Sequence, residues 1–157
     1  MTRISTYAAV AMFAAAITST VFIFSSREYD DRITSYVGGD GLEADVVVLP
    51  DGTRVSLGTR TSFSYDSRYG KSERIVQLEG EAYFEVTKNR HKPFTVQSDA
   101  MRVRVLGTTF NFKSDKSCRV AEATLIEGEI EVKGNKEEGQ IILAPGQRAE
   151  LNKKSGR

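Results

Sequence analysis

Cysteine and histidine are almost absent from this 157-residue chain, which contains one of each. The single cysteine, Cys118, cannot form an internal disulfide bond. Because Cys118 lies just before the apolar residues of a predicted strand, we expect a half-buried thiol. His91 lies in the charged segment KNRHKP, where we expect an exposed loop residue. The two residues are 27 positions apart and form neither a zinc-ligand pattern nor a nucleophile–base pair.

An excess of charge of one sign is also missing. The chain has 22 Lys and Arg residues against 21 Asp and Glu residues, which gives a formal net charge of +1. A nucleic-acid-binding domain would need clustered basic residues and a strong positive charge, so this class of function is excluded. The local basic excess at Lys153, Lys154 and Arg157 is expected to be a solvated tail over residues 153–157.

Sequence patterns of catalytic and ligand sites are missing as well. No glycine-rich phosphate loop leads into a helix. Four aspartates lie in predicted turns without the spacing of a calcium-binding loop: Asp45, Asp51, Asp66 and Asp115. We therefore expect no catalytic, metal-binding or cofactor-binding residues, and we do not expect an enzyme.

A long hydrophobic run is present only near the N-terminus. Residues 7–24 read YAAVAMFAAAITSTVFIF and carry no charge. A helix of this length spans roughly 27 Å, close to the ~30 Å hydrocarbon core of a bilayer. This predicts one transmembrane helix or signal anchor over residues 7–26, after a short cytoplasmic tail over residues 1–6. A cleaved signal peptide is the main alternative, because residues 14–16 form an A-x-A cleavage site. A buried core helix is a third.

The orientation of this segment follows from its position more than from its flanks. Arg3 and the α-amine precede it, and Arg27 and Arg32 follow it, so the flanking positive charge is balanced. A first hydrophobic segment so close to the start acts as an export signal. The rest of the chain is therefore predicted to lie outside the cytoplasm.

The exported part has the pattern of an all-β domain. After residue 30 no window keeps a 3.6-residue apolar period, and short runs rich in Val, Ile, Phe and Tyr follow one another. The charged and glycine-rich residues 27–45 are predicted to be a flexible linker. The domain is predicted over residues 46–152. Its expected strands are 46–49, 53–57, 75–78, 82–86, 94–97, 103–106, 109–112, 123–126, 129–132, 141–143 and 148–151.

Five glycines mark a degenerate internal repeat. Each precedes an alternating strand, and they are Gly52, Gly80, Gly107, Gly128 and Gly146. Alternation with period 2 places the apolar residues of each unit on one face, toward a shared core. Glycine at these points fits a turn with positive φ or close strand packing. The spacings of 28, 27, 21 and 18 residues are too irregular for an exact solenoid. A β-sandwich and a coil-like β-stack both remain open.

Six segments resemble, in the same order, the periplasmic domain of the FecR-like family. The combination of LPDGT, LEGEAYFEV, VLGTTFN and LIEGEIEV is specific, and the resemblance covers about residues 40–152. The six segments are 46–65, 74–89, 92–98, 101–112, 123–134 and 143–151. Members are single-pass anti-sigma-factor regulators in the bacterial inner membrane, with the β-domain in the periplasm. They couple TonB-dependent outer-membrane transporters to extracytoplasmic-function sigma factors in the control of iron and nutrient uptake.

Two departures from the family pattern bear on the partners. Only residues 1–6 precede the predicted anchor, where members usually carry a cytoplasmic sigma-binding domain. The chain stops at Arg157, where members usually continue into a further periplasmic module. We therefore expect a truncated or split regulator whose partners are proteins, namely a transporter signalling domain or another regulator, with the sigma factor reached only indirectly. The alternative is a module that binds envelope proteins or glycans without a transcriptional role. Exposed aromatics would favour glycan binding, and Tyr65 and Tyr69 are the only pair at such a spacing.

Two groups of residues are candidate partner-binding sites. In LEGEAYFEV, alternation places Glu81, Tyr83 and Glu85 on one solvated face. The strand region near the end of the domain offers a free edge, with Ile141, Leu143 and Leu151 as its candidate residues. An exposed edge can accept a strand from a partner by β-augmentation.

Overall fold

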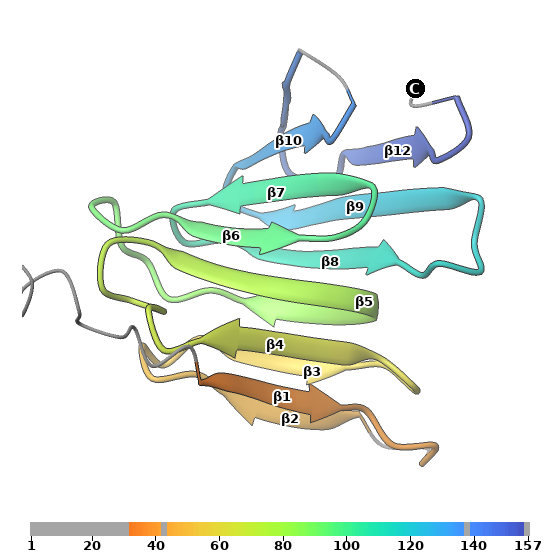
Figure 1. Cartoon of the computed structure of the whole chain (residues 1–157). Helices are drawn as coiled ribbons and strands as arrows, with labels where there is room; N and C mark the ends of the chain where they lie inside the picture. The colour runs from red at the N-terminus through yellow and green to blue at the C-terminus, as the bar shows by residue number, and fades with distance from the viewer. Residues whose placement is uncertain (1–31, 42–43, 137–138, 156–157) are drawn as a thin grey trace, which may run out of the picture. The chain divides into compact units, whose positions relative to one another are not determined.

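The computed structural model describes residues 32–41, 44–136 and 139–155. These ranges contain twelve strands and no helix, which confirms the all-β class (Figure 1). The predicted membrane segment, residues 7–26, lies outside the described residues. Within the described ranges, no helix has the length and apolar character needed to span a bilayer. The strands are β1 (Ile33–Val37), β2 (Asp45–Val48), β3 (Arg54–Leu57), β4 (Ser62–Asp66), β5 (Arg74–Glu85), β6 (Phe94–Gln97), β7 (Met101–Val105), β8 (Thr109–Ser114), β9 (Val120–Glu127), β10 (Ile130–Gly134), β11 (Ile141–Leu143) and β12 (Arg148–Asn152).

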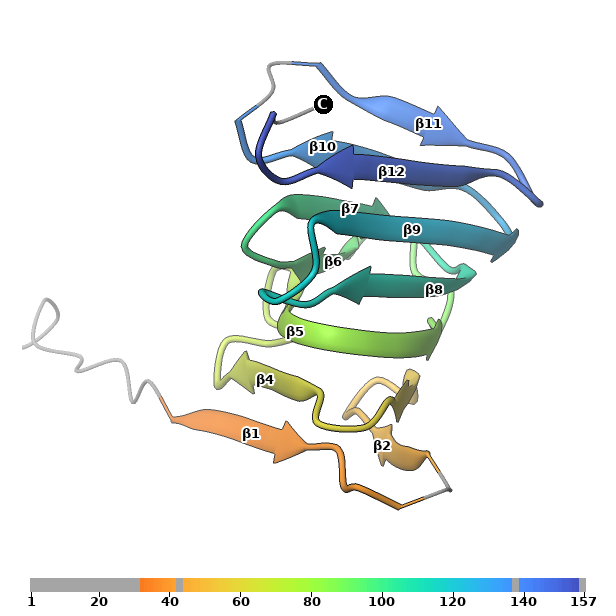
Figure 2. The same cartoon turned by 90° about the vertical axis from the view of Figure 1, so that its right-hand side faces the viewer.

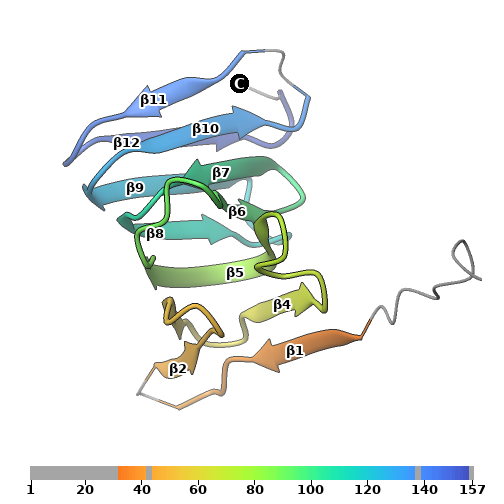
Figure 3. The ribbon, with the colours of Figure 1, turned by 90° about the vertical axis from the view of Figure 1, so that its left-hand side faces the viewer.

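The strands form two sheets that share one long strand. Sheet A has the order β1-β4-β5-β6-β7-β10-β11, and sheet B has the order β2-β3-β5-β8-β9-β12. All pairings are antiparallel except that of β5 with β6. β1 and β2 lie at one end of the stack, and β11 and β12 lie at the other (Figures 2 and 3). The chain passes repeatedly from one sheet to the other, so the sandwich is wound as a coil.

The core lies between the inner faces of the sheets. β5 alternates buried and more exposed residues along its whole length, as a half-buried strand does. Aromatic rings fill the centre, and those of Phe84 and Phe110 stack with centroids 4.9 Å apart. Fully buried phenylalanines come from both sheets: Phe63, Phe84, Phe94, Phe110 and Phe112.

The five repeat glycines all have positive φ, as their position before each strand predicts. Gly107, Gly128 and Gly146 lie between strands of different sheets, and Gly80 lies inside β5 where this strand leaves sheet A for sheet B. The expected separation of 75–78 from 82–86 is therefore wrong. β5 is continuous because Gly80, with φ of 122°, bends the strand without ending it.

The linker prediction over residues 27–45 is also wrong in part. Residues 33–37 form β1, which pairs with β4, and residue 45 begins β2. β1 and β4 were both missed. Tyr36 is the one half-buried residue of β1 and the other four are exposed, so this strand lacks a buried apolar alternation and depends on pairing with β4. In β4 the inward alternation is limited to Phe63 and Tyr65.

Candidate functional site

The outer face of sheet B carries the predicted acidic surface. Glu81, Tyr83 and Glu85 lie on one face of β5, while the side chains between them are buried, as alternation predicts. Glu85 is 3.3 Å from Arg54, and Glu81 is 3.3 Å from Lys113. These half-exposed pairs contribute little stability but neutralise the acids. The face is therefore electrically balanced around one tyrosine, Tyr83, which is 37% exposed.

The predicted edge is real, but its three residues do not lie together. Among the residues that the structure describes, β11 is the last strand of sheet A and pairs with β10 alone, so no described strand pairs with its other side. Ile141 is 53% exposed, whereas Leu143 is buried opposite Ile130 and Leu151 of β12 packs against the core. Leu143 is therefore a core residue. Ile142, which is 60% exposed, is the accessible residue that the sequence pattern missed.

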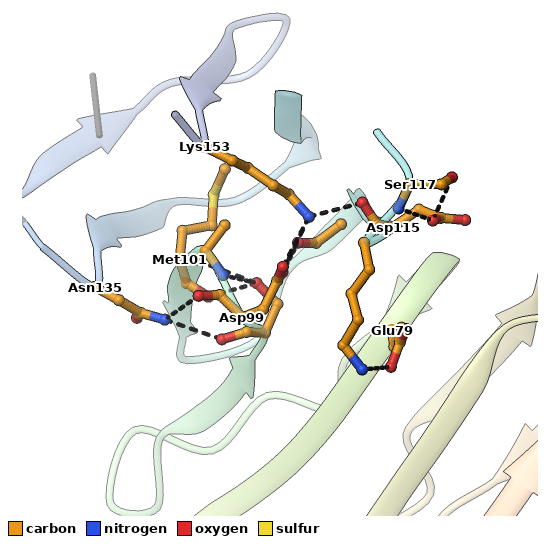
Figure 4. Close-up of polar contacts among 11 residues, drawn as sticks. Glu79, Asp99, Met101, Asp115, Ser117, Asn135 and Lys153 are labelled. Atoms are coloured by element: carbon orange, nitrogen blue, oxygen red, sulfur yellow. Dashed lines mark hydrogen bonds and ion pairs between the residues drawn. The ribbon is translucent and has the colours of Figure 1, made fainter. Parts of the chain in front are cut away.

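A polar cluster centred on Asp99 joins three distant parts of the chain (Figure 4). Lys153 Nζ lies 3.0 and 3.1 Å from the two Asp99 carboxylate oxygens and donates to the Asp115 carbonyl oxygen at 2.7 Å. Ser114 Oγ donates to Asp99 at 2.8 Å. The Lys153 side chain is only 14% exposed. The expected solvated tail is therefore wrong at this residue, which fastens the end of β12 to two turns.

The environment of Asp99 stabilises its charged form. Burial acts to raise the pKa of the carboxyl group, but hydrogen bonds from Ser114 and Lys153 outweigh it and hold the pKa below its usual 3.8. Two depressions of about 200 Å³ flank this residue. Among the described residues, no three His, Cys, Asp or Glu side chains are grouped to hold a metal ion.

Acid is expected to weaken this cluster. Because the pKa of Asp99 is lower in the folded than in the unfolded chain, its contribution is complete above roughly pH 5 and is lost as the pH falls through the folded value. Asp99→Asn should therefore flatten the decline of the unfolding free energy between about pH 5 and pH 2. Urea unfolding at several pH values measures this. Asp40→Asn is the control, since Asp40 is 85% exposed and its nearest ion pair is 3.9 Å long. An unchanged slope for Asp99→Asn would contradict the argument.

A second polar network is buried and was not predicted. Arg74 is 1% exposed, and its Nη1 donates to Asp51 at 2.7 Å and to the Thr87 carbonyl at 2.8 Å. Its Nε donates to the Lys92 carbonyl at 2.8 Å, and the guanidinium lies 5.6 Å from the centre of the Phe94 ring. Its Nη2 is buried with no hydrogen-bond partner among the described residues. The Arg74 side chain, at the start of β5, therefore joins its own strand to three other segments: the turn at Asp51, the residue Thr87 after β5, and residues 92–94.

Asp51 is the acceptor at the centre of this network. It accepts hydrogen bonds from Tyr69 Oη at 3.0 Å and from the Thr53 hydroxyl at 2.8 Å. Burial acts to raise the pKa of Asp51, but the bonds from Arg74 and Thr53 lower it below its usual value. Burial first, and the Asp51 carboxylate second, raise the pKa of Tyr69. The sequence placed Asp51 correctly in a turn, but nothing local to it indicates Arg74.

Four further residues named in the sequence analysis lie outside these clusters or at their edge. His91 is exposed, as predicted. Cys118 is exposed rather than half-buried, because it lies in the turn that precedes β9. Tyr65 and Tyr69, the pair that could favour a glycan, pack with centroids 5.1 Å apart against the hydrophobic core. They form no exposed aromatic platform.

Comparison with known proteins places these features in a family. The family described as FecR protein matches residues 36–131. Two crystal structures of a candidate anti-sigma factor from Parabacteroides distasonis, at 2.50 and 1.65 Å resolution, are each 32% identical to this chain. Their TM-scores are 0.74 and 0.73, over 80% and 79% of this chain. The chain spans 58% and 57% of those proteins. Among curated proteins, none matches.

Proposed function

We propose that this chain, which belongs to the FecR protein family, forms the signal-transducing β-domain of a membrane-anchored regulator. In this proposal residues 7–26 anchor the chain once in the bacterial inner membrane and the β-domain lies in the periplasm. The domain then helps to couple TonB-dependent outer-membrane transport to extracytoplasmic-function sigma factors. The observation that carries the proposal is the fold itself, which matches candidate anti-sigma factors at 32% identity over 80% of the chain.

The domain is proposed to act by protein contact rather than by catalysis or through a cofactor. Its partner would be a transporter signalling domain or another regulator, and the sigma factor would be reached only through that partner. Both surfaces that the sequence suggested fit this mode of action. The face around Tyr83 is charge-balanced and partly apolar, and the free side of β11 leaves backbone N–H and C=O groups available for an added strand.

A pull-down of the full chain from solubilised membranes tests this function. Mass spectrometry of the bait and of the captured proteins should find the intact residue 1–157 chain with a sigma factor, an anti-sigma partner or a transporter signalling domain. A bait that begins at residue 17 or later and brings down only envelope proteins would contradict both the anchor and the regulatory role.

Lysines on β11 are expected to reduce partner capture strongly. Ile141→Lys/Ile142→Lys places two charges on the free edge strand, where charge discourages pairing with another strand. Capture should fall by roughly tenfold or more, equivalent to about 1.4 kcal/mol of binding free energy. The amount captured in the same pull-down measures this.

The opposite end of the molecule supplies the matched control. Val46→Lys/Val48→Lys changes two valines of another edge strand, β2, which are 50% and 62% exposed. This variant should capture the partner as the unmodified chain does. Equal losses in both variants would mean that β11 has no special role.

A further inference from the structure

The outer face of sheet A carries two like charges directly opposite each other. In the pairing of β7 with β10, Arg102 lies across from Lys133. Residues in this relation have their Cβ atoms about 4.5–5.5 Å apart, and like charges there are destabilising. Both side chains are exposed, and within the described part of the chain neither forms an ion pair.

Further basic residues extend this surface. Arg104 follows on β7 and has only a 3.8 Å contact with Glu131. On the other side of β7, the residues opposite Arg102 and Arg104 are the uncharged Gln97 and Thr95. Lys88 and Arg90 join Arg104 around a depression of about 310 Å³, together with Leu106, Glu129 and Glu131. We call Lys88, Arg90, Arg102, Arg104 and Lys133 the basic stripe.

On sheet B, in contrast, exposed basic residues have acidic partners. On its outer face Arg54 pairs with Glu85, Lys113 with Glu81, and Arg148 with Glu122. The basic stripe has five cations against two nearby acids, Glu129 and Glu131. Solvent and salt screen part of this repulsion, and an anion bound at the stripe would relieve more of it.

We propose that the basic stripe is a docking surface for an extended acidic segment of a protein partner. Arg102 and Arg104 are two residues apart on a strand, so their side chains repeat every 6.6–6.8 Å or so. Alternate side chains of an extended peptide have the same spacing, so two acidic residues of the peptide can each place a carboxylate on one of these two arginines. Exposed aliphatic side chains border the stripe, Leu106 at 40% and Ile142 at 60%, and fit a segment that also carries apolar residues. The inference rests on the proposed function for the partner being a protein.

Binding of an acidic peptide tests the proposal directly. The full chain in micelles of an uncharged detergent is titrated into fluorescein-labelled decaglutamate, and fluorescence anisotropy is followed at low and high salt. The unmodified chain should bind, more weakly at high salt because screening weakens exposed charge pairs. Arg102→Glu/Lys133→Glu should weaken binding by roughly tenfold or more. Arg60→Glu/Lys154→Glu changes the net charge equally at exposed positions outside the stripe and should bind normally.

A single reversal separates a binding role from a structural one. Arg102→Glu places an acid opposite Lys133, so this variant should unfold at an equal or higher urea concentration while it binds decaglutamate less tightly. Equal binding by the reversal variants and the control, or no binding by the unmodified chain, would overturn the proposal. Binding of glycerol phosphate, a lipid-headgroup probe, in place of the peptide would also overturn it. If decaglutamate binds as expected but the pull-down yields no regulatory protein, the proposed function fails and the acidic-ligand site stands.

Discussion

Arg74→Met should lower the free energy of unfolding by about 3 kcal/mol. The substitution keeps most of the side-chain volume but removes the donors to Asp51, Thr87 and Lys92. Asp51 would then be a carboxylate, 21% exposed, without its cation. Breaking one side of a buried ion pair is costly because the remaining charge stays desolvated. Urea unfolding of the purified chain, followed by circular dichroism, measures the change.

An exposed ion pair of the same domain is the control for this prediction. Lys113→Met breaks the contact with Glu81, in which both side chains are nearly half exposed, and should cost less than about 1 kcal/mol. In the double variant Arg74→Met/Asp51→Asn the uncompensated charge is gone, so part of the lost stability should return. A double variant whose loss equals the sum of the single losses would show that the two residues are not coupled.

Gly80→Ala should also destabilise the domain, by about 3 kcal/mol or more, through two separate effects. A Cβ atom at this position would lie 2.5 Å from Thr61 Oγ1 and 2.8 Å from Thr61 Cα, so backbone would have to move. The residue also has φ of 122°, a conformation that L side chains rarely adopt and that costs about 1–3 kcal/mol. Since β5 crosses between the sheets here, a shift would disturb both. The urea midpoint is the measurement.

Two other glycines separate steric clash from backbone strain. Gly146 has φ of 82° but nothing within 4 Å of an added Cβ, so Gly146→Ala should cost only the strain, about 1 kcal/mol. Gly139 has open space and no positive φ, so Gly139→Ala should be neutral or slightly stabilising. The expected order of stability loss is Gly80, then Gly146, then Gly139. Equal losses for Gly80→Ala and Gly146→Ala would contradict the contact with Thr61.

Most strands of residues 46–152, all except β4, were accessible to prediction because their signal is local. Alternation in LEGEAYFEV correctly assigned Ala82, Phe84 and Val86 to the core and the acids to the surface. The short runs at 94–97 and 141–143 correspond to β6 and β11. β1 was missed because ITSYV does not alternate apolar and polar residues and lies in a charged and glycine-rich stretch; in the structure most of its residues are exposed.

The candidate sites were less predictable, since they join residues that are far apart in the chain. Asp51 and Arg74 are 23 positions apart, and Lys153 reaches Asp99 across 54. The basic stripe exists only through the register of β7 with β10, which places Arg102 opposite Lys133. A shift of one residue would have separated these charges onto opposite faces.

Sequence patterns alone predicted the all-β class, most of the strands and the resemblance to the FecR family, and they indicated positive φ or close packing at the five repeat glycines. These properties depend on period-2 alternation, on single-residue backbone preferences and on motif order, and all three can be read from residues that are close together in the sequence. Three features became visible in the folded chain alone: Gly80 bends one strand between two sheets, Leu143 is core while Ile142 is surface, and Arg74 is buried against Asp51. Those outcomes depend on strand register and on packing between sheets, where residues distant in sequence share one environment.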